Sequence, residues 1–179
     1  MCGPEKCATM RRLLILVVTA LVVAVPARAS ANTVPNWDRH FLLETAEGAH
    51  FEISMGKIAA RKGHSREARA AGQVMVRDHS GELHAVQALA KALGVKLPTA
   101  PSILQQHEIG NTSTHTGAAF DRAYARLEVG DHIGDLQSAD GETVEGQLPA
   151  ARALAQKYRL MYLRHLAIFR KLAHGVKAS

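Results

Sequence analysis

One short segment of this chain occurs twice in nearly the same form. Residues 76–83 and 129–136 share valine, aspartate, histidine, glycine and leucine at matching positions, and both carry an acid at the seventh position. The apolar residues around each copy recur at helical spacing, so each copy predicts a helix that carries an Asp-His pair. The repeat therefore indicates a fold made of two similar halves, each contributing such a helix.

Helical periodicity continues through most of the chain. It predicts four long helices, over about residues 36–61, 65–93, 117–139 and 149–174. We expect Asn36 or Asp38 to cap the first of them, and a glycine-containing break at residues 140–146 to separate the last two. No stretch alternates with period two, so no strand is expected.

The lengths of the connections select the architecture. Short links join the first helix to the second and the third to the fourth, whereas residues 98–116 form a long link with about one helical turn. One long crossover between helices two and three is the connectivity of a ferritin-like bundle. The predicted fold is therefore all-α, a ferritin-like four-helix bundle.

The N-terminal segment has the features of a signal peptide. Arg11 and Arg12 precede an apolar run over residues 13–25, and small-x-small cleavage sites follow within residues 27–31. The run is shorter than the roughly 20 residues that a membrane-spanning helix needs. We expect residues 1–31 to be a signal peptide, residues 32–179 a single domain without a transmembrane span, and the location periplasmic or otherwise extracytoplasmic.

Composition excludes several classes of function. Cys2 and Cys7 both lie in the predicted leader, so the mature chain offers no disulfide, thiolate metal site or cysteine nucleophile. The net charge of +6 is modest, part of it belongs to the leader, and no nucleic-acid motif occurs, so no nucleic-acid partner is expected.

Each predicted helix places one candidate ligand on its inward face. These candidates are Glu52, His79, His132 and His165. Burying strongly polar groups is costly unless they are paired, so we expect the four to meet in the core. Imidazole and carboxylate together suit a transition metal ion such as Zn, Fe or Cu.

Four acids accompany the repeated histidines. Asp78 and Asp131 lie about 100° around the helix from His79 and His132, and are expected to orient an imidazole of a neighbouring helix. Glu82 and Asp135, three residues after the histidines, are expected behind the ligands or as additional ones. A structural polar network without metal and an acid–base catalytic role remain alternatives.

The sequence does not predict an enzyme. A classical di-iron site needs a Glu from each of two helices and Glu-x-x-His from each of the other two. The fourth predicted helix contains no acid at all, so the carboxylates are too few. An alternative to metal binding is a structural or stress-related interaction module, in which the basic fourth helix contacts an envelope protein or anionic lipid.

An ordered set of segments resembles a bacterial family of exported proteins with a domain of unknown function, often labelled outer membrane proteins. The matching segments include residues 41–42, 52–53, 56–59, 75–80, 94–98, 117–124, 131–132 and 163–166. The resemblance implies export and a ferritin-like bundle and supports Glu52, His79, His132 and His165, but implies no activity. Two departures, Leu160-Met161 and Val129-Gly130, would remove a kink and place a flexible glycine near His132.

Overall fold

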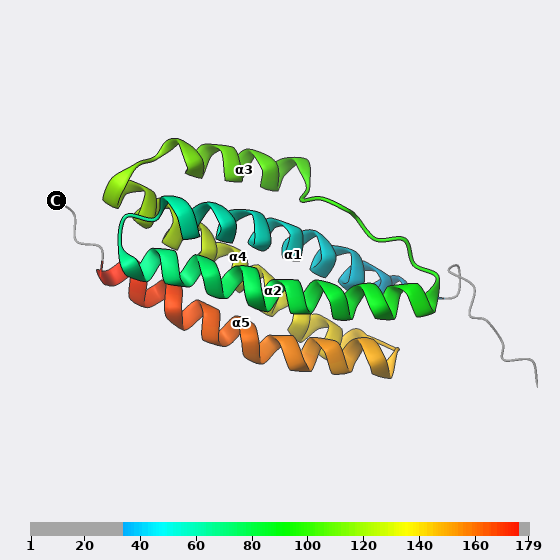
Figure 1. Ribbon diagram of the computed structural model, residues 1–179. Helices are drawn as coiled ribbons and strands as arrows, with labels where there is room; N and C mark the ends of the chain where they lie inside the picture. The colour runs from blue at the N-terminus through cyan, green and yellow to red at the C-terminus, as the bar shows by residue number, and fades with distance from the viewer. Residues whose placement is uncertain (1–33, 176–179) are drawn as a thin grey trace, which may run out of the picture.

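The computed structural model describes residues 34–175, which form five α-helices (Figure 1). They are α1 (Asn36–Lys62), α2 (Arg66–Leu93), α3 (Ile103–Thr114), α4 (Gly117–Glu145) and α5 (Pro149–Gly175). No strand occurs in this part of the chain. The prediction of an all-α fold is confirmed.

Four long helices form the bundle, and α3 lies on its outside (Figure 1). The chain neighbours α1 and α2 pack tightly against each other, as do α4 and α5, and the contacts of α1 with α4 and of α2 with α5 close the ring. The short α3 packs on α1 and α4. The bundle with one crossover is therefore as predicted from the lengths of the links.

Two segments differ from the sequence-based expectation. The crossover contains a helix of 12 residues, α3, which begins with a capping box between Ser102 and Gln105. The expected break at residues 140–146 is also wrong, because α4 continues to Glu145. Gly141 lies inside α4 against Trp37, where a Cβ would be 2.9 Å from the indole ring. This glycine allows tertiary packing and does not end the helix.

The expected cap of α1 has a different role. Asn36 begins the helix after Pro35, and no side chain caps it. Asp38 is fully buried in the first turn of α1, where its carboxylate accepts hydrogen bonds from the backbone N–H groups of Gln147 (3.1 Å) and Leu148 (2.7 Å). Asp38 therefore fixes the turn before α5 instead of capping its own helix.

Asp121 of α4 does the same for the other half. Its carboxylate accepts hydrogen bonds from the backbone N–H groups of His64 and Ser65, both at 2.8 Å, in the turn before α2. Each helix pair thus supplies an aspartate that holds the turn of the other pair. This reciprocity agrees with the two similar halves that the repeated segment indicates.

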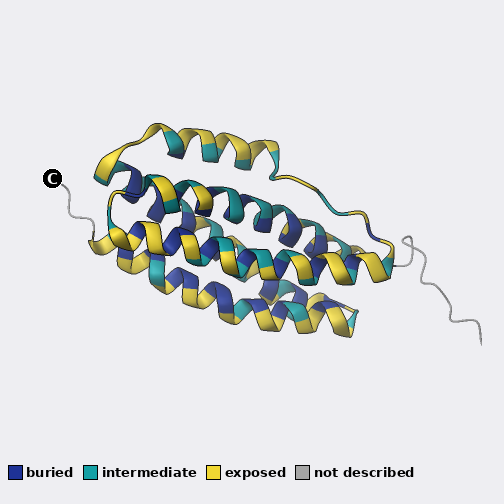
Figure 2. Ribbon diagram, viewed as in Figure 1, coloured by how far each residue is buried: buried dark blue, intermediate teal, exposed yellow. Residues whose placement is uncertain are grey.

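The core has two apolar regions with polar residues between them. One region gathers around Phe41, Leu42 and Val86, and the other around Phe51, Met75 and Phe169. The dark faces of the helices in Figure 2 all point into the bundle. Along α2, α4 and α5 a buried histidine separates the two apolar regions. The polar site is therefore enclosed at both ends by apolar side chains.

Three predictions concern export, the membrane and the envelope. The signal peptide predicted for residues 1–31 lies outside the described residues. Within residues 34–175, no helix has both the length and the hydropathy needed to cross a bilayer. On α5 the basic side chains of Arg152, Lys157, Arg164, Arg170 and Lys171 are exposed. Exposed basic side chains are expected on any solvated helix face, so contact of α5 with the envelope stays a prediction.

Two glycines bring α1 and α2 into unusually close contact. A Cβ on Gly56 would lie 2.8 Å from the carbonyl oxygen of Gly72, and one on Gly72 would lie 2.6 Å from the backbone nitrogen of Ala60. These atoms are backbone and cannot move aside individually. The whole α1–α2 spacing therefore depends on the absence of side chains at these two positions.

We expect Gly72→Ala to lower the free energy of unfolding by about 1–3 kcal/mol, because the added methyl group overpacks the interface. Gly81→Ala is a matched control in the same helix, since no atom lies within 4 Å of the added Cβ. It should be neutral or stabilise by about 0.5–1 kcal/mol through helix propensity. Urea unfolding followed by circular dichroism measures both, and equal effects of the two variants would contradict the close contact.

A buried acid near Asp38 makes stability depend on pH. Burial, with the charge of Asp38 adding to it, raises the pKa of Glu142 from 4.5 to about 8. The folded state therefore binds this proton more tightly than the unfolded state does. The associated stability is present below pH 4.5 and is lost as the pH rises through about 8.

Glu142→Gln removes this titration and keeps the side-chain shape. In the presence of a chelator, we expect the variant to lose less stability than the parent protein between pH 5 and pH 8.5. The measurement is the urea midpoint at the two pH values. Parallel losses in the two proteins would show that Glu142 does not titrate as described.

Candidate metal centre

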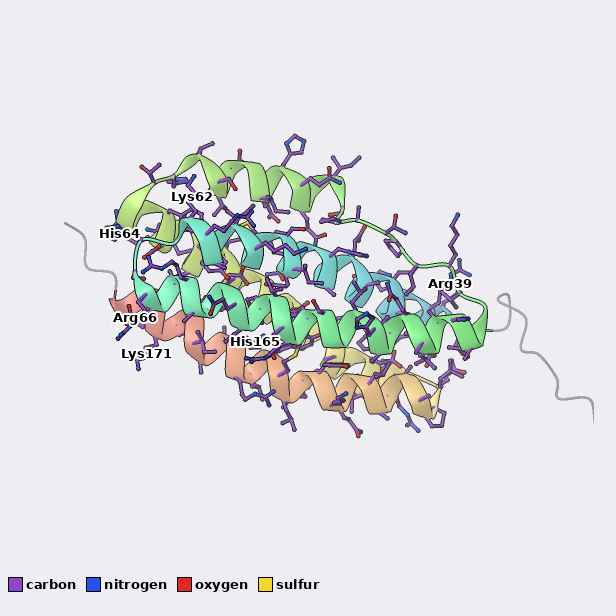
Figure 3. All side chains as sticks on the ribbon, in the orientation of Figure 1. Arg39, Lys62, His64, Arg66, His165 and Lys171 are labelled. Atoms are coloured by element: carbon purple, nitrogen blue, oxygen red, sulfur yellow. The ribbon has the colours of Figure 1, made fainter. Side chains whose placement is uncertain are left out.

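Three histidines from three helices meet in the core. His79 of α2, His132 of α4 and His165 of α5 are all buried, and each offers a ring nitrogen within 4.8 Å of those of the other two. Their ring centroids are 5.1–5.6 Å apart. Figure 3 shows His165 in the middle of the bundle, between α2 and α5. The helical stripes of the sequence predicted this meeting.

The first ring is held by an acid of its own helix. The Nδ1 atom of His79 lies 2.7 Å from Oε2 of Glu82, one turn further along α2. The other oxygen of Glu82 accepts a hydrogen bond from the hydroxyl of Tyr162 on α5. With Glu82 as the acceptor of this contact, the donated proton lies on Nδ1 of His79. Its Nε2 is buried and has no hydrogen-bond partner among the described residues.

The second ring is held by an acid of another helix. The Nε2 atom of His165 lies 3.0 Å from Oδ2 of Asp78 on α2. Partial burial alone would raise the pKa of Asp78, but its bonds with Arg77 and His165 bring that pKa below the ordinary value. Asp78 is therefore ionised at neutral pH and can only accept, so His165 donates from Nε2. The lone pair of His165 is then on Nδ1.

The third ring is held by the backbone. The Nδ1 atom of His132 lies 2.9 Å from the carbonyl oxygen of Glu128, which can only accept a hydrogen bond. His132 therefore carries its proton on Nδ1 and a lone pair on Nε2. This Nε2 lies 3.1 Å from Nδ1 of His165. Two lone pairs thus face each other across a short distance.

The electrostatics of the core keep His132 and His165 neutral at neutral pH. Burial lowers the pKa of His132, and the neighbouring His79 and His165 lower it further. Burial also lowers the pKa of His165 to about 4, although the bond with Asp78 acts in the opposite direction. A proton is therefore a poor bridge between the two lone pairs at neutral pH. A metal ion, which needs neutral imidazole ligands, fits this arrangement.

A second cluster adjoins the histidines. Glu52 of α1, with Asp131, His132 and Asp135 of α4, brings four ligand atoms within 4.8 Å of one another. Oε1 of Glu52 is 3.6 Å from Nδ1 of His132, beyond hydrogen-bond distance. Both oxygens of Glu52 are buried without a hydrogen-bond partner among residues 34–175. His132 therefore lies between a group of imidazoles and a group of carboxylates.

The carboxylates of this second cluster are difficult to ionise. Burial raises the pKa of Glu52 well above its usual value, and the nearby Glu128 and Asp131 raise it further. Burial likewise raises the pKa of Asp131 and Asp135, and that of Glu128 to about 8. Burial is the largest cause for each of these groups, and the negative charge of neighbouring carboxylates adds to it. Positive charge placed among them would favour their ionised forms.

The four predicted ligands do not form one group. His79, His132 and His165 meet as predicted, whereas Glu52 lies with Asp131 and Asp135 on the other side of His132. Asp78 orients an imidazole of a neighbouring helix, as expected for it, and Glu82 lies behind His79. Asp131 was also expected to orient an imidazole of a neighbouring helix, but it lies beside Glu52.

Sequence reasoning missed two residues of the centre. Glu128 is fully buried, and its Oε2 lies 3.6 Å from Nδ1 of His132. Its spacing of four residues before His132 places both on one face of α4, a signal that the sequence offered. Tyr162 was not predicted, because a tyrosine within an apolar helical stripe is usually an ordinary core residue. With Glu128 included, the centre holds more carboxylates than the sequence pattern predicted.

Comparisons with known proteins agree with this fold. A crystal structure of a DUF305 fragment from Deinococcus radiodurans has a TM-score of 0.70 to this chain, at 11% sequence identity, and the match covers 79% of this chain and 97% of that one. At such identity the likeness shows the fold alone. No curated protein sequence matches the chain.

The sequence itself matches one family model over residues 23–172, a span that includes every residue of the centre. The description of that family gives no location, so the outer-membrane label attached to the resemblance has no support from it. The chain belongs to the family described as Domain of unknown function (DUF4142).

Proposed function

We propose that this protein binds a transition metal ion in the core of its bundle through His79, His132 and His165. One observation carries the proposal: each of the three rings has one nitrogen in a hydrogen bond with an oxygen atom, the lone-pair nitrogens of His132 and His165 lie 3.1 Å apart, and His79 offers a ring nitrogen within 4.8 Å of theirs. Hydrogen bonds that fix the second nitrogen of a ligating histidine are typical of metal sites. A purely structural network gives no reason for lone pairs to converge.

The ligands favour certain ions. Three imidazole ligands suit Zn²⁺ and Cu²⁺, which bind nitrogen ligands strongly among the divalent first-row metals, and Fe²⁺ is a weaker candidate. Residues 8–179 contain no cysteine, so the site has no thiolate ligand. We therefore propose Zn²⁺ or Cu²⁺ as the ion, with metal binding rather than a particular reaction as the function.

The proposal includes export to the periplasm. Its support is the basic, apolar and small-residue pattern of residues 1–31. The full chain expressed in a bacterium should be recovered from the periplasmic fraction in a shorter form, with an N-terminus near residue 32. Retention of residues 1–31 in the cytoplasmic fraction would contradict it.

The metal site is tested with protein that carries no histidine tag. After treatment with a chelator, the protein is titrated with Zn²⁺ or Cu²⁺. Bound metal is measured by inductively coupled plasma mass spectrometry. We expect one ion per chain at the histidines and a higher melting temperature, since an ion at about 100 times its Kd stabilises a fold by about 2.7 kcal/mol. A folded protein that binds no ion would favour a structural polar network.

Variants assign the ion to the three rings. His79→Gln and His165→Gln should each remove the ion and its effect on the melting temperature. His84→Gln is the matched control, because His84 is an exposed histidine on α2. Asp78→Asn should keep the stoichiometry and weaken the affinity roughly 10- to 100-fold, because Asp78 only orients His165. Unchanged affinity in His79→Gln, with the fold confirmed by circular dichroism, would reject this site.

A further inference from the structure

The carboxylates beside His132 are not explained by a metal ion at the three histidines. Glu52, Asp131 and Asp135 bring oxygen atoms together from α1 and α4. The Nδ1 atom of His132 faces them but donates to the carbonyl oxygen of Glu128. The ring therefore offers its only lone pair, on Nε2, to the histidine group. What remains on this side is a set of oxygen ligands.

Glu52 of this group and the adjacent Glu128 are buried without hydrogen-bond partners among the described residues. Glu52 and Glu128 have no measurable exposure, and all four of their carboxylate oxygens lack a hydrogen-bond partner in the described part of the chain. Oδ2 of Asp131 also lacks one. A buried carboxylate with no donor is costly, and native proteins seldom keep one without a reason. A cation bound among these oxygens would supply that reason.

A cleft connects this region with solvent. It has a volume of about 500 Å³, lies between α1 and α4, and is bordered by Gln105 of α3. Asp131 and Asp135 line it together with Glu44 and Glu47 of α1, and no lysine or arginine is among its described lining residues. Such a negative cleft concentrates cations by focusing the field. It leads from the surface to the two aspartates that adjoin Glu52.

The cleft and the contact between Asp78 and His165 lie on opposite sides of the bundle. The ring order of the helices is α1, α2, α5, α4, so the α1–α4 side faces away from the α2–α5 side. The partly exposed Asp78 reaches His165 across the α2–α5 side. The oxygen group thus has a separate route to solvent.

We propose that Glu52, Asp131 and Asp135 form a second cation site, which takes a hard divalent cation such as Mn²⁺ through the acidic cleft between α1 and α4. Carboxylate oxygens suit Mn²⁺, Mg²⁺ and Ca²⁺, whereas imidazole suits Zn²⁺ and Cu²⁺. This inference rests on the proposed function in one respect, which is that the three histidines bind the other ion. The centre then holds two unlike ions, one on each side of the His132 ring.

The test uses the whole protein loaded with Zn²⁺ and then titrated with Mn²⁺. The electron paramagnetic resonance signal of free Mn²⁺ measures how much is bound, and elemental analysis measures Zn²⁺. We expect one Mn²⁺ per chain with Zn²⁺ retained. Glu52→Gln and Asp135→Asn should each weaken Mn²⁺ binding roughly 10- to 100-fold, since the loss of ligand charge lowers the affinity of such sites, and should leave Zn²⁺ in place.

Two further variants separate the sites. His79→Gln should lose Zn²⁺ and keep Mn²⁺. Glu142→Gln is the matched control, because Glu142 is also a buried α4 acid without a partner among the described residues, but lies outside both clusters. It should bind both ions like the parent protein, and equal weakening of Mn²⁺ binding in Glu142→Gln and Glu52→Gln would overturn the assignment.

The possible failures are distinguishable. If Zn²⁺ binds and Mn²⁺ does not, the second site is wrong and the histidine site stands. If Mn²⁺ displaces Zn²⁺, the two groups form one shared site, which also overturns the inference. If Mn²⁺ binds and depends on Glu52 while Zn²⁺ does not bind, the oxygen site stands and the proposed function fails.

Discussion

The hydrogen bond between His165 and Asp78 determines much of the chemistry of this core. Because Asp78 is ionised and can only accept, His165 must donate from Nε2 and direct its lone pair toward His132. His132 donates to a carbonyl and directs its own lone pair back. Burial makes protonation of either ring unfavourable. This arrangement supports the proposed metal ion, which would accept electron pairs from both rings.

The rest of the bundle makes such a core possible. The two apolar regions enclose the polar residues at both ends, and the reciprocal bonds of Asp38 and Asp121 fix the turns before α5 and α2. The close approach at Gly56 and Gly72 sets the spacing of α1 and α2. Small changes in this frame would move ligand atoms from four helices, because each helix carries its part of the centre rigidly. Stability and the proposed metal binding are linked in this way.

Much of the architecture was predictable because it follows from local pattern. The 3.6-residue period gave the four long helices, and the lengths of the links gave the crossover. Errors arose where a residue acts on a distant segment. Asp38 resembles a local cap but binds the backbone near residue 147, and Gly141 resembles a helix break but makes room for Trp37. Neither partner is adjacent in sequence, so no local rule finds it.

The sequence by itself determined which side chains face the interior, because helical spacing places His79, His132, His165 and Glu52 on buried faces. Only the tertiary structure decided how these four side chains group. The rotation of each helix about its axis and its position along the bundle set which nitrogen meets which acceptor. The tertiary structure separated Glu52 from the three histidines and placed it with Asp131 and Asp135. The physical reason is that helix phase follows from hydrophobicity, whereas ligand grouping depends on distances of a few ångströms between helices far apart in the chain.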